Sequence, residues 1–380
     1  MKKRLSILLA VVCLLTVLTF SGCTKRNAPA AEEDATPAPA PVEEVIPEAV
    51  PEVTPEAAPE ATPKSTPEPT PEPEAPKAPK GNINPLTGEP LDKDITSLRP
   101  ITCMLNNHTD ALPQCGISSA DIIYELPEEG ITRMLGVFAQ IPDCDRLGSV
   151  RSSRPYHADV SLSYDAIFVH WGRSDRAAGF FYSTGIDHIE LNEEPALGYA
   201  YRDYSHTKGG TEHTGFIKTE QLRKFISDKG WRTEHEGAHE YGFTFSDNVQ
   251  PNGGDAQKVR VHLAGKISNF EYSAADGGYK MYEYGVDYVD GDSGKMPVFK
   301  NVLALRTTIY DETGLADIVL TNTSGTGTFY CNGKQEDFTW ERGDYSDNFH
   351  YYKLDGTPLE FGVGKTYICV ISTNDTVELY

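Results

Sequence analysis

The sequence predicts an α+β protein in which an N-terminal mixed α/β layer domain is followed by a mostly antiparallel β domain. Between residues 101 and 229, apolar runs of strand length alternate with stretches whose apolar residues recur at helical spacing. Beyond residue 251 the apolar runs are short and are separated by Gly, Asp and Asn turns. Residues 247–255, rich in Gly with one Pro, separate the two patterns. We therefore expect domains at residues 81–250 and 251–380.

Residues 1–22 have the pattern of a signal peptide. A basic head at residues 2–4 precedes the apolar run 5–20, which is shorter than the roughly 20 residues of a membrane-spanning helix. The run ends in FSGC, which resembles a bacterial lipobox. We expect cleavage before Cys23 and diacylation of Cys23, including palmitate, because two acyl chains hold a protein stably on a bilayer. The alternative is an ordinary signal peptide with an incidental cysteine.

Residues 23–80 carry the acylated cysteine and then a tract of Pro, Glu, Thr and Ala. Such a composition buries too little apolar surface to offset the entropy of folding, and it predicts a disordered, extended spacer. At about 3.1 Å per residue the spacer would reach on the order of 150 Å. The expected location of the mature protein is the outer face of the bacterial cell membrane, held there by lipid.

The net charge limits the possible partners. The signal segment contributes +3 and the linker −7, so the globular remainder carries about −18 of the total −22. A body this acidic has no general basic surface for a nucleic acid, so we expect no nucleic-acid partner. An anionic ligand would need a local basic pocket.

The first domain opens with strands predicted at 101–105, 121–125 and 132–140. The stretch 146–173 then reads as a turn, a short helix with Ser153 as a possible N-cap, and a buried strand that ends at His170. A glycine-rich loop at 200–216 leads into a helix at 218–229, which Gly230 terminates. Strands of the second domain are expected at 259–263, 279–284, 302–310, 318–321, 327–331, 349–352 and 365–371.

Two polar concentrations stand out in this acidic chain, one in 146–173 and one in 200–216. If the predicted element order is right, their side chains lie at loop-facing ends of neighbouring elements, where working residues are usually presented. We expect a polar pocket with Glu125 or Asp121 as the balancing acid and with these ligand-binding candidates: Arg151, Arg154, His170, Arg202, His206 and His213. Guanidinium groups suit bidentate capture of carboxylate or phosphate. The alternative is that the arginines pair with surface carboxylates.

Three strings invite other functions. His235-Glu236-Gly237-Ala238-His239 matches the zinc-protease pattern, but glycines around it and the lack of a long apolar helical face favour a polar loop. Residues 362–366 read GVGKT, yet the first glycine of a P-loop is missing and a strand follows. Ser149, Ser152 and Ser153 lie near histidines, but no nucleophile elbow is present. We expect no metal site and no cofactor.

The cysteines beyond Cys23 are five in number and contain no CxxC pair, which argues against zinc-ribbon and thioredoxin-like sites. Cys103 and Cys369 lie within apolar runs and are expected to be buried. A disulfide between Cys115 and Cys144 is compatible with an exported protein, and the sequence leaves it open.

Several blocks of the chain resemble the YerB-like bacterial lipoproteins. These blocks are NPLTGEPL, RPITCMLNNHTDALPQCGISSADIIYELPEEGITRMLGVF, RLGSVRSSRPYHADVSLSYDAIFVHWG, GTFYCNGKQEDFTW and FGVGKTYICVI, within residues 82–375. The resemblance implies a two-domain exported lipoprotein of unassigned activity. It supports the lipid anchor and the domain boundary, and it implies no mechanism.

Two classes of function follow from these observations. The first is a binding or scaffold lipoprotein whose pocket takes an anionic cell-wall polymer, a peptide carboxylate or an envelope protein. The second is an envelope hydrolase or transferase, with His170 or His213 as general base and arginines stabilising a developing anion. The sequence leaves open whether the protein is an enzyme. A histidine within hydrogen-bond reach of a serine or an acid inside a cleft would favour catalysis.

Overall fold

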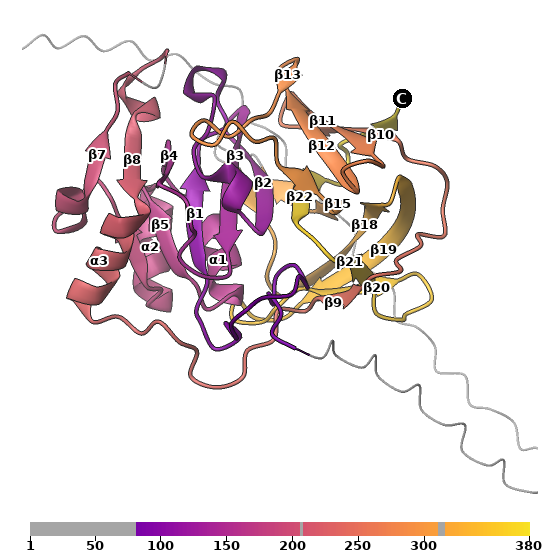
Figure 1. Ribbon diagram of the computed structural model, residues 1–380, viewed down its shortest axis with the longest axis horizontal. Helices are drawn as coiled ribbons and strands as arrows, with labels where there is room; N and C mark the ends of the chain where they lie inside the picture. Colours follow the sequence, from indigo (N-terminus) through magenta and orange to yellow (C-terminus); the bar gives the residue numbers. More distant parts are fainter. Residues whose placement is uncertain (1–80, 206–207, 311–315) are drawn as a thin grey trace, which may run out of the picture. The chain divides into compact units, whose positions relative to one another are not determined.

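The computed structural model describes residues 81–205, 208–310 and 316–380. All of these residues belong to one compact unit that spans Glu72–Tyr380. Its α-helices lie in the part of the chain coloured from indigo through magenta to rose-red, whereas the orange-to-yellow part consists of strands and loops (Figure 1). The fold is mixed α/β, with more sheet than helix. In the described ranges, no helix has both the length and the apolar character needed to cross a bilayer.

One large sheet organises the molecule. Its ten strands are β1 (Ile101–Leu105), β2 (Ile122–Glu128), β3 (Ile131–Phe138), β5 (Ile167–His170), β6 (His188–Glu190), β15 (Asn301–Thr307), β18 (Thr323–Cys331), β19 (Lys334–Arg342), β20 (His350–Lys353) and β22 (Thr366–Ser372). They lie in the order β20-β19-β18-β15-β22-β2-β3-β1-β5-β6. Strands from both sides of residue 250 therefore share one sheet.

Strand β22 joins the two parts of the chain. It runs parallel to β2 on one side, with Ile122 opposite Thr366, and parallel to β15 on the other, with Asn301 also opposite Thr366. Residues 366–371 are all buried. A central strand with parallel neighbours is covered on both faces, which explains why TYICVI is an almost continuous apolar run.

Smaller sheets complete the fold. A six-stranded sheet contains β10 (Lys258–Leu263), β11 (Lys266–Ser273), β12 (Gly278–Glu283), β13 (Val286–Asp287), β14 (Val298–Phe299) and β23 (Val377–Leu379). A three-stranded sheet has the order β4 (Arg146–Gly148), β8 (Gly215–Lys218), β7 (Ala200–Arg202). Two strand pairs are formed by β16 (Ile309–Tyr310) with β17 (Asp317–Ile318), and by β9 (Thr244–Ser246) with β21 (Glu360–Gly362).

Three α-helices are described: α1 (Pro155–Ser163), α2 (Asp175–Thr184) and α3 (Thr219–Lys229). Helix α1 begins one residue later than the expected cap at Ser153 implies. Arg154 occupies its N-cap position, and the Arg154 backbone N–H donates to Nδ1 of His157 at 2.9 Å. Helix α3 ends at Gly230, whose φ of +63° is the left-handed cap conformation that favours glycine.

Four short 3-10 segments connect these elements, at Thr109–Ala111, Ile117–Ser119, Ala196–Tyr199 and Thr211–His213. The first follows strand β1 and the last precedes strand β8. No disulfide joins the five described cysteines, so Cys115 and Cys144 are not cross-linked.

Candidate functional site

The turn at residues 211–214 brings together three of the predicted site residues. At the end of β7, Arg202 donates from Nη1 to the carbonyl oxygen of Thr211 at 2.5 Å and to Oγ1 of Thr214 at 3.1 Å. Arg151 donates from Nη1 to the carbonyl oxygen of Glu212 at 2.9 Å. His213 lies in the same turn and is buried. Both guanidinium groups thus converge on the backbone around His213.

The indole of Trp171 supports this arrangement. Its ring lies under the Arg202 guanidinium, 4.6 Å from ring centroid to Cζ, in cation–π contact. The backbone N–H of Trp171 donates to the carbonyl oxygen of Arg151 at 2.9 Å. Since Trp171 follows strand β5, that strand fixes the positions of both arginines.

His213 contacts a second polar group at the end of strand β1. Its ring stacks on that of His108, with centroids 4.9 Å apart and an interplanar angle of 17°. Its Nδ1 lies 2.8 Å from Nδ2 of Asn106. Burial lowers the pKa of His213, and the positive charge of Arg151 lowers it further, so the imidazole is neutral near pH 7.

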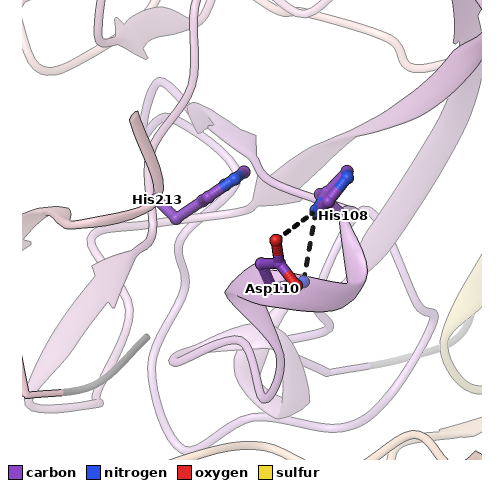
Figure 2. Close-up of side chains that lie close together, drawn as sticks. All are labelled: His108, Asp110 and His213. Atoms are coloured by element: carbon purple, nitrogen blue, oxygen red, sulfur yellow. Dashed lines mark hydrogen bonds and ion pairs between the residues drawn. The ribbon is translucent and has the colours of Figure 1, made fainter. Parts of the chain in front are cut away.

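Asp110 completes this group from the 3-10 segment after β1. Its Oδ2 lies 3.8 Å from Nδ1 of His108. Figure 2 shows His108 and Asp110 on one loop and the His213 ring facing them from another. Ligand atoms of the three side chains all lie within 4.8 Å of one another.

Arg154 lies in a different environment from Arg151 and Arg202. Its guanidinium pairs with Glu129 at 2.7 Å and with Glu128 at 2.5 Å. Glu128 is fully buried and also pairs with Arg133 at 2.5 Å. Burial raises the pKa of Glu128 to about 7, against the pull of both arginines. Arg154 therefore pairs with carboxylates of the protein itself, in line with the alternative in which the arginines pair with carboxylates.

His170 does not join the other candidates. It is fully buried at the end of β5, with Nε2 3.0 Å from Nδ1 of His188 and Nδ1 3.0 Å from the carbonyl oxygen of Gly172. Burial, with a smaller effect of His188, lowers the pKa of His170 to about 3. Both ring nitrogens are engaged, which leaves His170 unsuited to act as a general base. His206 lies outside the described residues.

The two acids expected to balance the arginines lie elsewhere. Glu125 accepts from Lys266 at 2.5 Å and from Tyr367 at 2.7 Å, and it is fully buried. Asp121 accepts from the side chain of Asn84 at 2.9 Å and from the backbone N–H of Ala139 at 2.8 Å. The acids that pair with Arg154 are instead Glu128, the last residue of β2, and Glu129, which follows it.

Sequence reasoning missed Asn106, His108, Asp110 and Trp171 as members of this site. A topological signal could have found them, because β1 and β5 run parallel and their carboxyl ends meet at one edge of the sheet. Polar residues that follow neighbouring parallel strands are frequent ligand contacts. The missing knowledge was that these two strands are neighbours.

A cleft of about 580 Å³ extends from His108 toward the six-stranded sheet. Basic and polar side chains line it, and none of its lining residues is acidic; they include His108, Thr109, Arg260, Lys266, Asn269 and Tyr284. Tyr284 donates its hydroxyl to the carbonyl oxygen of Asn107 at 2.6 Å and so ties the cleft wall to the end of β1. His108 belongs to both the cleft and the histidine pair.

The HEGAH string lies in a second cleft, of about 410 Å³, and is not helical. Nδ1 of His235 is 2.7 Å from Oδ2 of Asp165, and its Nε2 is 2.8 Å from the Tyr241 hydroxyl. His239 stacks on His235 with centroids 4.5 Å apart. This histidine–acid pair meets the geometric criterion for catalysis, but both nitrogens of His235 are occupied and Asp165 also binds Arg232 at 2.7 Å.

Comparisons with known proteins place these features in context. Residues 86–232 match the family model described as the N-terminal domain of the protein of unknown function DUF3048, and residues 258–368 match its C-terminal domain. The chain is 29% identical over 303 residues to "Putative lipoprotein YerB" of Bacillus subtilis, covering 78% of this chain and 88% of that protein. The crystal structure of YerB protein from Bacillus subtilis matches with a TM-score of 0.65 and 27% identity, over 77% of this chain and 98% of that one.

Proposed function

The chain belongs to the YerB-like DUF3048 family, and from that premise we propose that it is a lipid-anchored lipoprotein that binds an anionic ligand of the cell envelope. Acyl chains on Cys23 hold it on the outer face of the cell membrane, and the linker lets the globular part reach into the envelope. The ligand binds at the surface formed by Arg151, Arg202, Trp171 and His213, here called the arginine surface.

One observation carries the binding proposal. Within the described ranges, neither Arg151 nor Arg202 forms an ion pair, although the chain carries a net charge of −22. Both donate instead to carbonyl oxygens of one turn, which orients the guanidinium groups. Glu128 and Glu212 act on Arg151 electrostatically, without a direct ion pair among the described residues. Two oriented guanidinium groups without a direct carboxylate partner can attract an anion locally.

Donors without acceptors support the same reading. Nε of Arg151 and Nε1 of Trp171 are buried and have no hydrogen-bond partner in the structure. Both groups can only donate, and a buried donor without an acceptor is costly to leave unsatisfied. An oxyanion at this surface would accept from both. The chemistry suits a phosphate of a cell-wall glycopolymer or a carboxylate of a wall peptide.

Catalysis is the weaker candidate. His170 has both nitrogens engaged inside the protein, and no serine or cysteine donates to the ring nitrogens of His213 in the described ranges. A histidine general base needs a nucleophile or water within reach and a hydrogen-bonded orienting group. The geometry therefore favours binding over hydrolysis or transfer.

The test is binding of poly(glycerol phosphate) and of a muramyl peptide to the mature chain, made with Cys23→Ser so that it carries no acyl groups. We expect Arg151→Ala and Arg202→Ala each to weaken the affinity for the preferred polymer about 10- to 100-fold, because each removes a charged hydrogen bond. Arg151→Lys should restore little of it, because lysine lacks the planar fork.

Arg223→Ala is the matched control, since Arg223 is exposed on helix α3 and lies outside the arginine surface. It should bind like the parent protein. Equal loss in the control and in Arg151→Ala, or no binding of either polymer by the parent, would overturn the proposal.

A further inference from the structure

The group of His108, Asp110 and His213 has a composition that the anion proposal does not use. Two imidazoles and one carboxylate present ligand atoms within 4.8 Å of one another. A second carboxylate is close, because Oε1 of Glu212 lies 3.7 Å from Nε2 of His213. Adjacent ligand atoms around a first-row divalent metal are separated by about 3–4 Å, since each metal–ligand bond is about 2.0–2.2 Å long. The spacing observed here is near that range.

We propose that His108, Asp110 and His213, with Glu212 as an additional ligand, form a binding site for a divalent transition metal ion. Imidazole nitrogens combined with carboxylate oxygens suit zinc and the neighbouring first-row metals. The two carboxylates would balance the charge of the ion. With three protein ligands, the metal ion keeps a coordination position open to solvent. With Glu212 as a fourth ligand the position can still open, because this exposed carboxylate can dissociate from the metal.

The exposure of the side chains fits this role. His213 is buried and held by Asn106, whereas His108 and Asp110 are half-exposed and Glu212 is exposed. A fixed imidazole with three adjustable partners lets small side-chain rotations close the remaining gap around an ion.

The hydrogen bonds around Asn106 determine how the site would rearrange when a metal ion binds. The Asn106 amide accepts from the backbone N–H of His108 at 3.0 Å and directs Nδ2 toward both Nδ1 of His213 and Oγ of Ser149. A metal on Nε2 of His213 requires Nδ1 to carry a proton, so the amide must turn its oxygen toward that ring. Asn106 is therefore a positioning residue for the metal ligand.

Other charged groups lie near the site and determine its net charge. Arg151 lies on the backbone side of Glu212 and opposes a cation, whereas Asp110 and Glu212 attract one. The two carboxylates of Asp110 and Glu212 outweigh the single positive charge of Arg151 by one. A bound dication leaves the locality positive, which would strengthen anion capture at the arginine surface.

The experiment is calorimetric titration of the mature Cys23→Ser chain, without a histidine tag, with zinc chloride and separately with manganese and nickel chloride in a buffer free of phosphate. We expect one ion per chain for at least one metal. Asp110→Asn and His108→Ala should each weaken that affinity by a factor of ten or more. Asn106→Asp should tighten it, because a carboxylate accepts the Nδ1 proton of a metal-bound histidine.

His350→Ala is the matched control, because His350 is exposed on β20, outside this group. Asp110→Asn removes a half-exposed carboxylate without changing its size, so retained thermal unfolding separates lost binding from lost folding. Absence of one-to-one binding for all three metals, or equal weakening by His350→Ala, would overturn the proposal. The metal titration contains no anionic polymer, so a negative result there does not contradict anion binding at the arginine surface. Failed polymer binding likewise does not contradict a positive metal titration.

Discussion

Among single side chains, Lys266 has a demanding electrostatic environment, because it is buried between two acids. Its ammonium lies between Glu125 and Glu283, both fully buried, at 2.5 Å from an oxygen of each. Hydroxyl groups of Ser268 and Tyr367 donate to the second oxygen of Glu125, each at 2.7 Å. Burial alone would raise the pKa of Glu125, but Lys266 and these donors together hold it below its usual value.

Lys266→Met should therefore destabilise the protein by about 3–5 kcal/mol, because it leaves the buried carboxylate of Glu125 without its cation. The free energy of unfolding from urea denaturation measures the effect. Lys258→Met is the control, since Lys258 on β10 pairs with Glu271 at 2.9 Å on the surface, where ion pairs contribute little. Similar losses in the two variants would contradict the role assigned to Lys266.

Glu283 gives this cluster a defined dependence on pH. Burial raises its pKa from 4.5 to about 8, despite the opposing effect of Lys266. The folded state thus holds the proton more tightly than the unfolded chain does. The stability that Glu283 contributes is fully present below its unfolded pKa and is lost as pH rises through its folded pKa.

Glu283→Gln is neutral at every pH and should remove that contribution. The free energy of unfolding of the parent, minus that of the variant, should fall steadily between about pH 5 and about pH 8. Urea unfolding of both proteins across this range measures the difference. A difference that stays constant, or one that grows with pH, would show that Glu283 does not hold a proton in the folded state.

Two of the three histidines in the predicted site, His213 and His170, illustrate what a sequence can and cannot define. His213 and the arginines that flank it were recognised because polar residues concentrate in an acidic chain. His170 was grouped with them because it ends a strand, but strand alternation places its ring in the interior beside His188. Which face of a strand is buried depends on the neighbours, and those are set by pairing far along the chain.

Among the secondary-structure elements, local pattern located the strands of the ten-stranded sheet except β6 and β19, and it missed many of the short strands elsewhere. The expected strand at 101–105 coincides with β1, and the expected strand at 365–371 is displaced by one residue from β22. Strands β11 and β19 were not predicted. In β19, KQEDFTWER, three charged residues share the face of Phe338 and Trp340, so the alternation of apolar and polar residues is hidden and mean hydropathy is low.

The position of β22 could not be predicted in this way. A continuous apolar run indicates a buried strand, but nothing in TYICVI identifies β2 and β15 as its partners. Those partners begin 244 and 65 residues earlier in the chain, respectively, as the register of Thr366 with Ile122 and with Asn301 shows. Pairing over such separations is decided by the whole core, and so is the position of the site beside it.

For the molecule as a whole, the ten-stranded sheet is relevant to the predicted domain boundary at residue 250, because strands from both sides of that boundary belong to it. The two family models match the chain on either side of that point. The ten-stranded sheet nevertheless crosses it, and the buried cluster joins Glu125 of the first part to Lys266 and Tyr367 of the second. The division into domains at residues 81–250 and 251–380 stays a prediction, and the folding of the separate fragments can test it.

We expect the fragment 81–250 not to fold cooperatively on its own. Without β22, strand β2 becomes an edge strand although all seven of its residues are buried in the intact sheet, and Glu125 loses both Lys266 and Tyr367. An exposed apolar edge with an unpaired interior carboxylate favours aggregation over a native fold. Circular dichroism melting and size-exclusion chromatography of the fragment, beside residues 72–380, measure this. A monomeric fragment with a sharp transition like that of the longer chain would mean that the shared sheet is an interface between two independently stable domains.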